Sequence, residues 1–238
     1  ARGEHAPMRA AAAAAGAGLV AISPWRLHLR DDASTRERLR EALAAPRVVC
    51  TSPVAVRAAR RLQALRALPG QRWFAVGEGT ATTLRRAGVA DVAAPQRMDS
   101  EGLLSMTGLA DLQGEAIGFV TAPGGRGVLI PALEARGARV IRADVYERIA
   151  VAPSPRSLAR LAQLDAPTKL ALSSGEALAL VMEALSEPLR ERIRGAQVIA
   201  ASERLAGLAR QHGFTDIIVA RSARPTDLIA AAAAAATA

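Results

Sequence analysis

The chain has 238 residues, of which 50% are hydrophobic and 3% aromatic, and its formal net charge is +9 at pH 7. This length and apolar content suffice for one large domain or two ordinary domains with a buried core. The single cysteine, Cys50, excludes an internal disulfide and fits a reducing compartment. Because no segment predicts a membrane span or a secretion signal, we expect a soluble, cytoplasmic protein with no membrane partner.

The positive charge comes almost entirely from arginine, since Lys169 is the only lysine. A basic balance can indicate nucleic acid, a membrane surface or an acidic small ligand as partner. The arginines are scattered over predicted helix faces and few aromatic rings are available to stack on bases, so we do not expect nucleic acid. The histidines His5, His28 and His212 are far apart. No cluster has metal-ligand spacing, and we predict no metal.

Short apolar runs alternate with helical patterns along the whole chain. Strands are predicted at residues 19–22, 25–29, 47–50, 73–76, 91–93, 116–120, 140–141, 145–149, 169–172, 197–200 and 217–219. Helices are predicted at residues 6–15, 35–43, 54–65, 80–87, 100–106, 128–136, 156–163, 176–185 and 203–212, and from residue 226. Strands separated by helices of about ten residues imply parallel sheets with helices on both faces. The predicted fold class is α/β.

The stretch around Tyr146, the only tyrosine, predicts a crossing between two domains. A helix ends at Gly137, an apolar pair at 140–141 indicates a buried strand, and alternation over 145–149 indicates an exposed one. A tyrosine at such a crossing would stand at the mouth of a cleft. The alternative is that its ring caps the core while its hydroxyl meets water.

An internal repeat divides the chain into two copies of a unit of about 120 residues. The offset between matching positions lies between 121 (137 − 16) and 125 (213 − 88). The matching segments, in the same order in both copies, are 13–20 with 134–141, 48–56 with 170–178, and 84–92 with 208–217.

Each copy carries loops rich in Ser, Thr and Gly directly after predicted strands. In parallel α/β sheets, ligands bind outside the carboxyl ends of the strands, where helix N-termini offer free N–H groups. Simple helix capping explains any one of these loops. Two matching sets, however, would suit a ligand with many carboxylates or phosphates. The candidate binding residues are Thr51, Ser52, Gly77, Gly124, Arg126, Ser173, Ser174 and Ser202.

Cys50 also ends a predicted strand, but the loops of its repeat unit contain no histidine that would activate it. We therefore expect a buried strand residue and no nucleophile at this position.

Several of these motifs, taken together, resemble the uroporphyrinogen-III synthase family. The resemblance covers about residues 16–223, and it rests on Thr51-Ser52-Pro53, Val76-Gly77 with Thr80-Ala81, the glycine loop 124–127 before Leu129, Val145-Tyr146-Glu147-Arg148, the segment 173–178, and Ala201-Ser202-Glu203-Arg204. The sequence departs from the family at its start. The family opens with a strand that ends in an Arg-Pro turn, whereas this sequence begins at Ala1-Arg2-Gly3-Glu4 without such a strand. Either that strand is missing from this chain or the first domain is built differently.

The resemblance implies a fold of two similar α/β domains with parallel sheets flanked by helices, joined by a two-stranded connector. One domain is discontinuous and comprises residues 1–34 plus 152–238, and the other comprises residues 35–151. The connector strands lie near residues 25–29 and 145–149.

The resemblance also implies the reaction. Linear hydroxymethylbilane is cyclised to uroporphyrinogen III, with inversion of ring D and loss of water, in heme biosynthesis. The enzyme is a lyase that needs no cofactor, acts as a monomer, and allows a transient contact with the preceding pathway enzyme. By the same resemblance, Tyr146 donates a hydrogen bond to the leaving hydroxyl, and the candidate loop residues bind substrate carboxylates. A neutral phenol is a ready hydrogen-bond donor but a poor full acid, so we expect Tyr146→Phe to slow the enzyme without abolishing activity.

Two other classes of function stay open. A non-catalytic two-domain module that binds a small polyanionic ligand would turn over no substrate. An arginine-rich nucleic-acid binder would lose affinity steeply as salt is raised.

Overall fold

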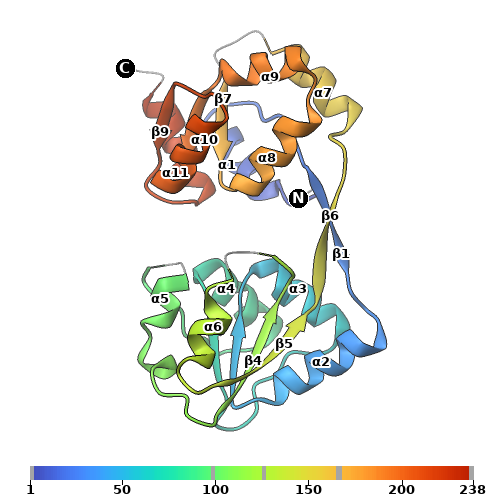
Figure 1. Cartoon of the computed structure of the whole chain (residues 1–238), viewed down its shortest axis with the longest axis vertical. Coiled ribbons are helices and arrows are strands. Elements are labelled where there is room, and N and C mark those ends of the chain that lie inside the picture. The colour runs from blue at the N-terminus through green and yellow to red at the C-terminus, as the bar shows by residue number, and fades with distance from the viewer. Residues whose placement is uncertain (1–2, 98–99, 125–126, 165–167, 236–238) are drawn as a thin grey trace. The chain divides into compact units, whose positions relative to one another are not determined.

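The computed structural model describes residues 3–97, 100–124, 127–164 and 168–235. The chain divides into two compact units, and each consists of a parallel sheet with helices packed on it (Figure 1). Unit 1 comprises Ala1–Arg26 and Ile149–Ala238, and unit 2 comprises Leu27–Arg148. This architecture confirms the predicted α/β class, with one unit discontinuous in sequence.

The sheet of unit 2 has the strand order β3-β2-β4-β5, with all neighbouring strands parallel. Its strands are β2 (Arg47–Cys50), β3 (Arg72–Ala75), β4 (Ala116–Thr121) and β5 (Arg139–Asp144). Cys50 pairs with both Ala75 and Val120, so the carboxyl ends of the strands meet at one edge of the sheet. The prediction of a strand at residues 91–93 is wrong, because only a single bridge from Ala93 to Phe74 extends the sheet there.

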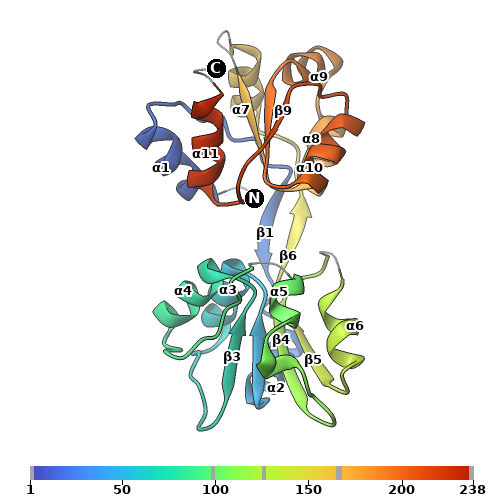
Figure 2. The same ribbon diagram turned by 90° about the vertical axis from the view of Figure 1, so that its left-hand side faces the viewer.

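Helices cover both faces of this sheet (Figure 2). Helices α2 (Ala33–Ala44), α3 (Pro53–Leu62) and α4 (Glu78–Ala87) lie on one face; α5 (Ser100–Leu104), the 3-10 helix η1 (Thr107–Leu109) and α6 (Leu129–Glu134) lie on the other. Successive strand residues point to opposite faces. Accordingly, Val48 and Cys50 pack with the first group, whereas Val49 packs with Leu133 of the second.

Helix α2 lies directly against β4, and Gly118 makes this approach possible. A Cβ atom at Gly118 would collide with the carbonyl oxygen of Ala42 in α2. The absence of a side chain therefore sets the spacing between this helix and the sheet.

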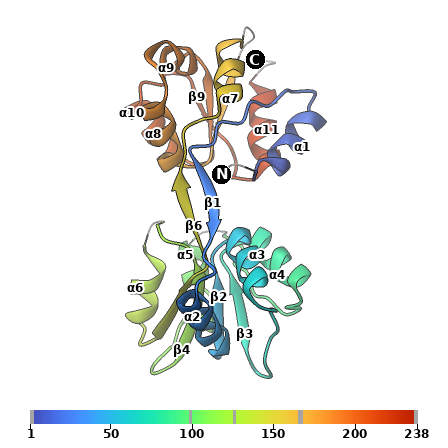
Figure 3. The ribbon, with the colours of Figure 1, turned by 90° about the vertical axis from the view of Figure 1, so that its right-hand side faces the viewer.

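The sheet of unit 1 has the parallel order β7-β8-β9. Its strands are β7 (Lys169–Leu172), β8 (Gln197–Ala200) and β9 (Ile217–Val219). One face of this sheet carries the apolar cluster that contains Val198. Four helices pack in that cluster: α7 (Pro155–Ala162), α8 (Gly175–Ala184), α9 (Glu187–Arg194) and α10 (Glu203–Gln211). On the other face, Ile199 packs with Leu228 and Met8, which belong to α11 (Pro225–Ala234) and α1 (Ala6–Ala14). Figure 3 shows α1 and α11 side by side.

Two further differences from the sequence-based prediction concern unit 1. Residues 19–22, predicted as a strand, form none, because the carbonyl of Ala21 accepts the Ser157 hydroxyl at 2.9 Å and that of Leu19 faces Arg9. Helix α9 was not predicted. Its apolar stripe consists only of Leu189 and Ile193, which is too short for the helical period to be evident.

The chain passes between the units in β1 (Trp25–Leu29) and again in β6 (Tyr146–Ala150), which pair with each other. The N–H of Arg30 donates to the carbonyl of Val145 at 3.2 Å, and that of Val151 donates to Pro24 at 2.9 Å. These two bonds at opposite ends make the pair antiparallel.

Candidate functional site

Helices α3, α8 and α10 each begin directly after a strand, at a serine in extended backbone. The Ser52 hydroxyl accepts the N–H of Ala55 at 3.1 Å. Ser174 and Ser202 accept in the same way from the N–H groups three residues further on, at 3.3 and 3.4 Å. Three of the four predicted site serines therefore serve as N-caps, and their recurrence in both units follows the internal repeat.

Helix α4 starts differently, at Gly77, which provides no side-chain cap. The carbonyl of Gly77 accepts the N–H groups of Thr80 and Ala81. Uncapped N–H groups at the start of a helix, together with the positive end of its dipole, form a favourable position for an anion.

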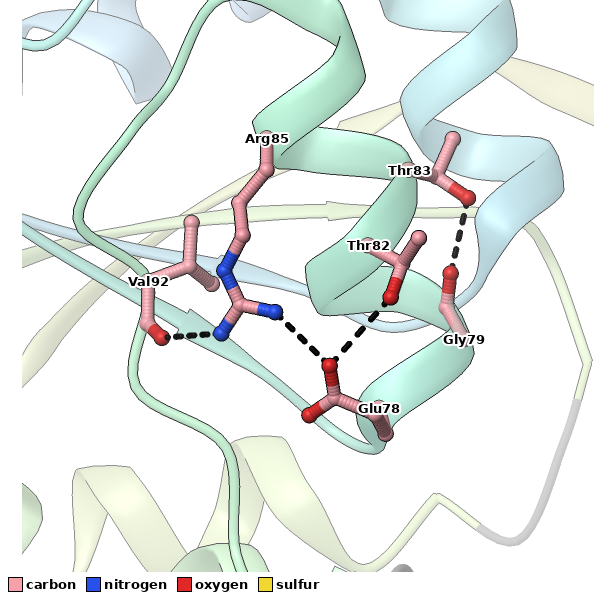
Figure 4. Close-up of polar contacts among 6 residues, drawn as sticks. All are labelled: Glu78, Gly79, Thr82, Thr83, Arg85 and Val92. Atoms are coloured by element: carbon pink, nitrogen blue, oxygen red, sulfur yellow. Dashed lines mark hydrogen bonds and ion pairs between the residues drawn. The ribbon is translucent and has the colours of Figure 1, made fainter.

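The first turn of α4 also carries a carboxylate, that of Glu78, and Figure 4 shows how it is held. Glu78 accepts a hydrogen bond from Arg85 at 2.7 Å and one from the Thr82 hydroxyl at 3.2 Å. Arg85 also donates to the carbonyl of Val92 at 3.2 Å, which fixes the guanidinium in place. The arginine therefore neutralises the negative charge closest to the start of this helix.

Tyr146 lies in the core of unit 2 and reaches the start of α3. Its side chain is 5% exposed and belongs to the apolar cluster beneath α2, α3 and α4. Its hydroxyl oxygen lies 3.4 Å from that of Ser52. A hydroxyl pair usually stands at about 2.7–2.8 Å, so this contact is long and leaves the phenol able to bond elsewhere.

A second pair of hydroxyls joins β2 to β4. The Thr51 hydroxyl lies 2.9 Å from that of Thr121, and the Thr51 N–H donates to the carbonyl of Val120 at 3.2 Å. Sequence reasoning predicted Thr51 and missed Thr121. The available signal was its position, because Thr121 follows the apolar run of β4 as Thr51 follows that of β2.

The remaining predicted residues are distributed as follows. Gly124 is exposed and has a φ of +88°, which favours glycine. Arg126 lies outside the described residues. Ser173 is exposed and belongs to unit 1 together with Ser174 and Ser202, whereas the other predicted residues belong to unit 2. Within unit 2, the predicted residues Ser52 and Tyr146 contact each other directly.

Cys50 is buried in β2 with 1% exposure, as predicted. Burial raises the pKa of its thiol to about 12, because the apolar surroundings disfavour the thiolate. The thiol is therefore protonated at neutral pH and is no nucleophile.

Unit 1 has a solvent-open cavity of about 330 Å³ that includes none of the predicted residues. It is lined by Arg9, Val20, Ala21, Arg156, Ser157 and Arg160. Because α1 and α7 lie far apart in the sequence, their arginines could not be grouped from the sequence alone.

Neither metal ligands nor a membrane span is found in the part of the chain that the structure describes. There, no three or more His, Cys, Asp or Glu side chains are grouped so as to hold a metal ion. Nor does any helix in the same ranges have the length and apolar character needed to cross a membrane.

The fold and the helix starts define a two-unit α/β protein with repeated, polar strand ends and a tyrosine beside one of them. Comparison with protein families identifies this class further. The chain belongs to the uroporphyrinogen-III synthase HemD family, whose model matches residues 6–230.

Individual relatives agree with the family. The chain is 34% identical over 154 residues to uroporphyrinogen-III synthase of Salmonella typhimurium. This alignment covers 64% of this chain and 63% of that protein. It is 33% identical over 153 residues to the Escherichia coli protein of the same name, covering 63% of this chain and 62% of the relative. The aligned regions thus span somewhat less than two thirds of these relatives.

Solved structures support the fold. The Helicobacter pylori uroporphyrinogen-III synthetase superposes with a TM-score of 0.62 at 14% identity, over 89% of this chain and 90% of that one. A mutant uroporphyrinogen III synthase of Thermus thermophilus gives 0.58 at 18% identity, over 97% and 94% of the two chains.

Proposed function

We propose that this protein is a uroporphyrinogen-III synthase, which cyclises hydroxymethylbilane to uroporphyrinogen III with inversion of ring D and loss of water. Membership of the family over residues 6–230 carries the proposal. In the same proposal the enzyme works as a cytoplasmic monomer without a cofactor, and contacts the preceding pathway enzyme at most transiently.

The chemistry assigned to Tyr146 is assistance to the leaving group. The hydroxymethyl oxygen departs as water, so it must gain a proton, and a hydrogen bond from the phenol stabilises the charge that develops on it. The substituted carbon of ring D then attacks the electrophilic methylene and forms a spiro intermediate. Because simple closure of the chain competes, the enzyme's main task is to hold the folded geometry in which this attack is faster.

The many carboxylates of hydroxymethylbilane suit the strand ends of both units. Serine caps occupy one N–H group of each helix and leave others for an anion, and α4 has no side-chain cap. The net charge of +9 adds attraction for a polyanion. We assign substrate binding to Thr51, Ser52, Gly77, Gly124, Arg126, Ser173, Ser174 and Ser202.

The test is to supply freshly generated hydroxymethylbilane and to separate the oxidised products by isomer. We expect a dominant type III product. Type I alone, the product of spontaneous closure, from a folded protein would overturn the proposal. Binding of the substrate without turnover would instead indicate a polyanion-binding module.

A further inference from the structure

We propose that Thr121, at the end of β4, is a positioning residue for the reaction: it fixes the relative placement of Ser52 and Tyr146. The inference rests on the proposed function for its catalytic consequence, and on hydrogen bonds within unit 2 for its geometry.

The side chain of Thr121 holds one member of that pair through its neighbour. Thr121 is only 9% exposed, and its hydroxyl lies 2.9 Å from that of Thr51. Thr51 immediately precedes Ser52, the cap of α3. Without the Thr121 hydroxyl, the Thr51 N–H would still donate to the carbonyl of Val120 at 3.2 Å, but the Thr51 hydroxyl would keep only a 3.5 Å contact to the same carbonyl. The side chain of Thr51, next to the cap of α3, would then be less firmly held.

The backbone of Thr121 holds the other member. Its carbonyl accepts the N–H of Val145 at 3.0 Å, and Val145 immediately precedes Tyr146. Val145 is fully buried, and its own carbonyl accepts the N–H of Arg30. A single residue therefore contacts the chain next to Ser52 with its side chain and the chain next to Tyr146 with its backbone.

This placement matters because the contact between Ser52 and Tyr146 is long. At 3.4 Å the two hydroxyls stand near the limit of hydrogen bonding, so a shift of a few tenths of an ångström decides whether the bond forms. Loosening Thr51 should therefore misdirect the phenol in the transition state. It should leave the carboxylate contacts of the ground state nearly unchanged.

The experiment compares Thr121→Val, which keeps the shape and removes the hydroxyl, with Thr121→Ser, which keeps the hydroxyl. We expect Thr121→Val to lower kcat for the type III product by about 3- to 10-fold, with KM within about twofold of wild type. The share of type I product should rise, and Thr121→Ser should restore most of the rate. Thr83→Val is the matched control, because it removes a hydroxyl that donates to Gly79 within α4. This variant should change neither kcat nor the share of type I product.

Two readouts separate positioning from a merely structural role. In a Tyr146→Phe background, Thr121→Val should have little further effect on kcat. The reason is that Thr121 is proposed to act by placing the phenol hydroxyl, which Tyr146→Phe has already removed. In addition, 3-fluorotyrosine labelling gives a single fluorine resonance, since Tyr146 is the only tyrosine. This resonance should move in Thr121→Val and stay in place in Thr83→Val.

A folded Thr121→Val protein with the wild-type kcat, or with an equal loss in the Tyr146→Phe background, would overturn the proposal. So would an unmoved fluorine resonance. If the wild-type protein forms no type III product, the proposed function fails and the catalytic part of this inference fails with it. The resonance would still decide whether Thr121 sets the surroundings of Tyr146.

Discussion

The hydroxyl oxygen of Tyr146 lies 3.4 Å from the hydroxyl oxygen of Ser52, the residue that caps α3. Because Ser52 already accepts the N–H of Ala55, its own proton is available to point towards the phenol oxygen. In that arrangement Ser52 uses none of the phenol's donor capacity. Tyr146 can then donate its proton to a ligand while Ser52 orients the phenol from the other side.

If the proposed function is correct, removing this phenol hydroxyl should slow the reaction without ending it. We expect Tyr146→Phe to lower kcat by about 10- to 100-fold, since a hydrogen-bond donor to the leaving group is lost while the folded substrate geometry remains. Steady-state kinetics with separation of product isomers measures the effect. The ring stays in the core, so the urea midpoint should change little. Complete loss of activity in a well-folded variant would contradict the modest role assigned to the phenol.

Replacing the serine caps of unit 1 should affect stability more than activity. We expect Ser174→Ala and Ser202→Ala each to cost about 1 kcal/mol in urea unfolding, the usual contribution of an N-cap. KM should stay within about twofold, because the helix N–H groups remain. Ser186→Ala is the control, since Ser186 occupies the N-cap position of α9 without a side-chain cap bond. A large rise in KM with unchanged stability would show instead that the hydroxyl itself binds substrate.

The close approach of α2 to β4 predicts that a methyl group at Gly118 is not tolerated. Gly118→Ala places a Cβ against the backbone carbonyl of Ala42, and we expect a loss of about 3 kcal/mol or more, or failure to fold. Gly207→Ala in α10 is the matched control, because nothing lies within 4 Å of a Cβ there. That change should stabilise unit 1 by about 0.5–1 kcal/mol. Equal unfolding midpoints for the two variants would contradict the packing described.

The pair of Arg85 with Glu78 predicts a charge effect on substrate affinity. In Arg85→Met the Glu78 carboxylate loses the contact with Arg85 beside the start of α4, so KM for the proposed polyanionic substrate, hydroxymethylbilane, should rise about 2- to 5-fold. Adding Glu78→Gln to Arg85→Met should return KM to the wild-type value. High salt should remove the difference in KM between Arg85→Met and the wild type. Arg38→Met, which breaks an exposed pair with Glu41 on α2, is the control. An unchanged KM in Arg85→Met would remove α4 from the binding surface.

Burial of Cys50 predicts an unreactive thiol and a pH effect on stability. Iodoacetamide should leave the native protein unmodified and alkylate it once in urea. Because the folded-state pKa is raised, this thiol contributes stability that is fully present below its ordinary value of 9.0 and is lost as pH rises towards about 12. Unfolding curves of Cys50→Ala should lack this component. Fast alkylation of the native protein at neutral pH would contradict the burial.

Much of the fold could be predicted because it depends on local patterns. β2 lies at the predicted residues 47–50, since an apolar run between polar residues specifies a buried strand directly. The serine caps of α3, α8 and α10 were visible for the same reason, because capping acts over three residues. Residues 19–22 have the composition of a strand, but a strand also needs a partner, and their carbonyls are engaged by side chains.

The candidate site could be predicted less completely, because it depends on distant residues. Ser52 and Tyr146 are 94 positions apart, and only the parallel sheet brings them together. Thr121 was missed because its significance depends on its two neighbours in space. The family resemblance implied domain boundaries near residues 34 and 152, and the two compact units of the structure divide at Arg26–Leu27 and Arg148–Ile149, within the connector strands.

The contact of α1 with α11 has a consequence for how the protein is made. Met8 and Leu228 share one apolar cluster, although 220 residues (228 − 8) separate them. At synthesis rates of roughly 5–20 residues per second, α1 waits about 10 to 45 s for its partner to leave the ribosome. Unit 2 is continuous and needs no such delay, so we infer that it folds first on the nascent chain. Protease resistance of unit 2 in ribosome-bound chains halted after residue 200, with α1 still cleavable, would be the signature of that order.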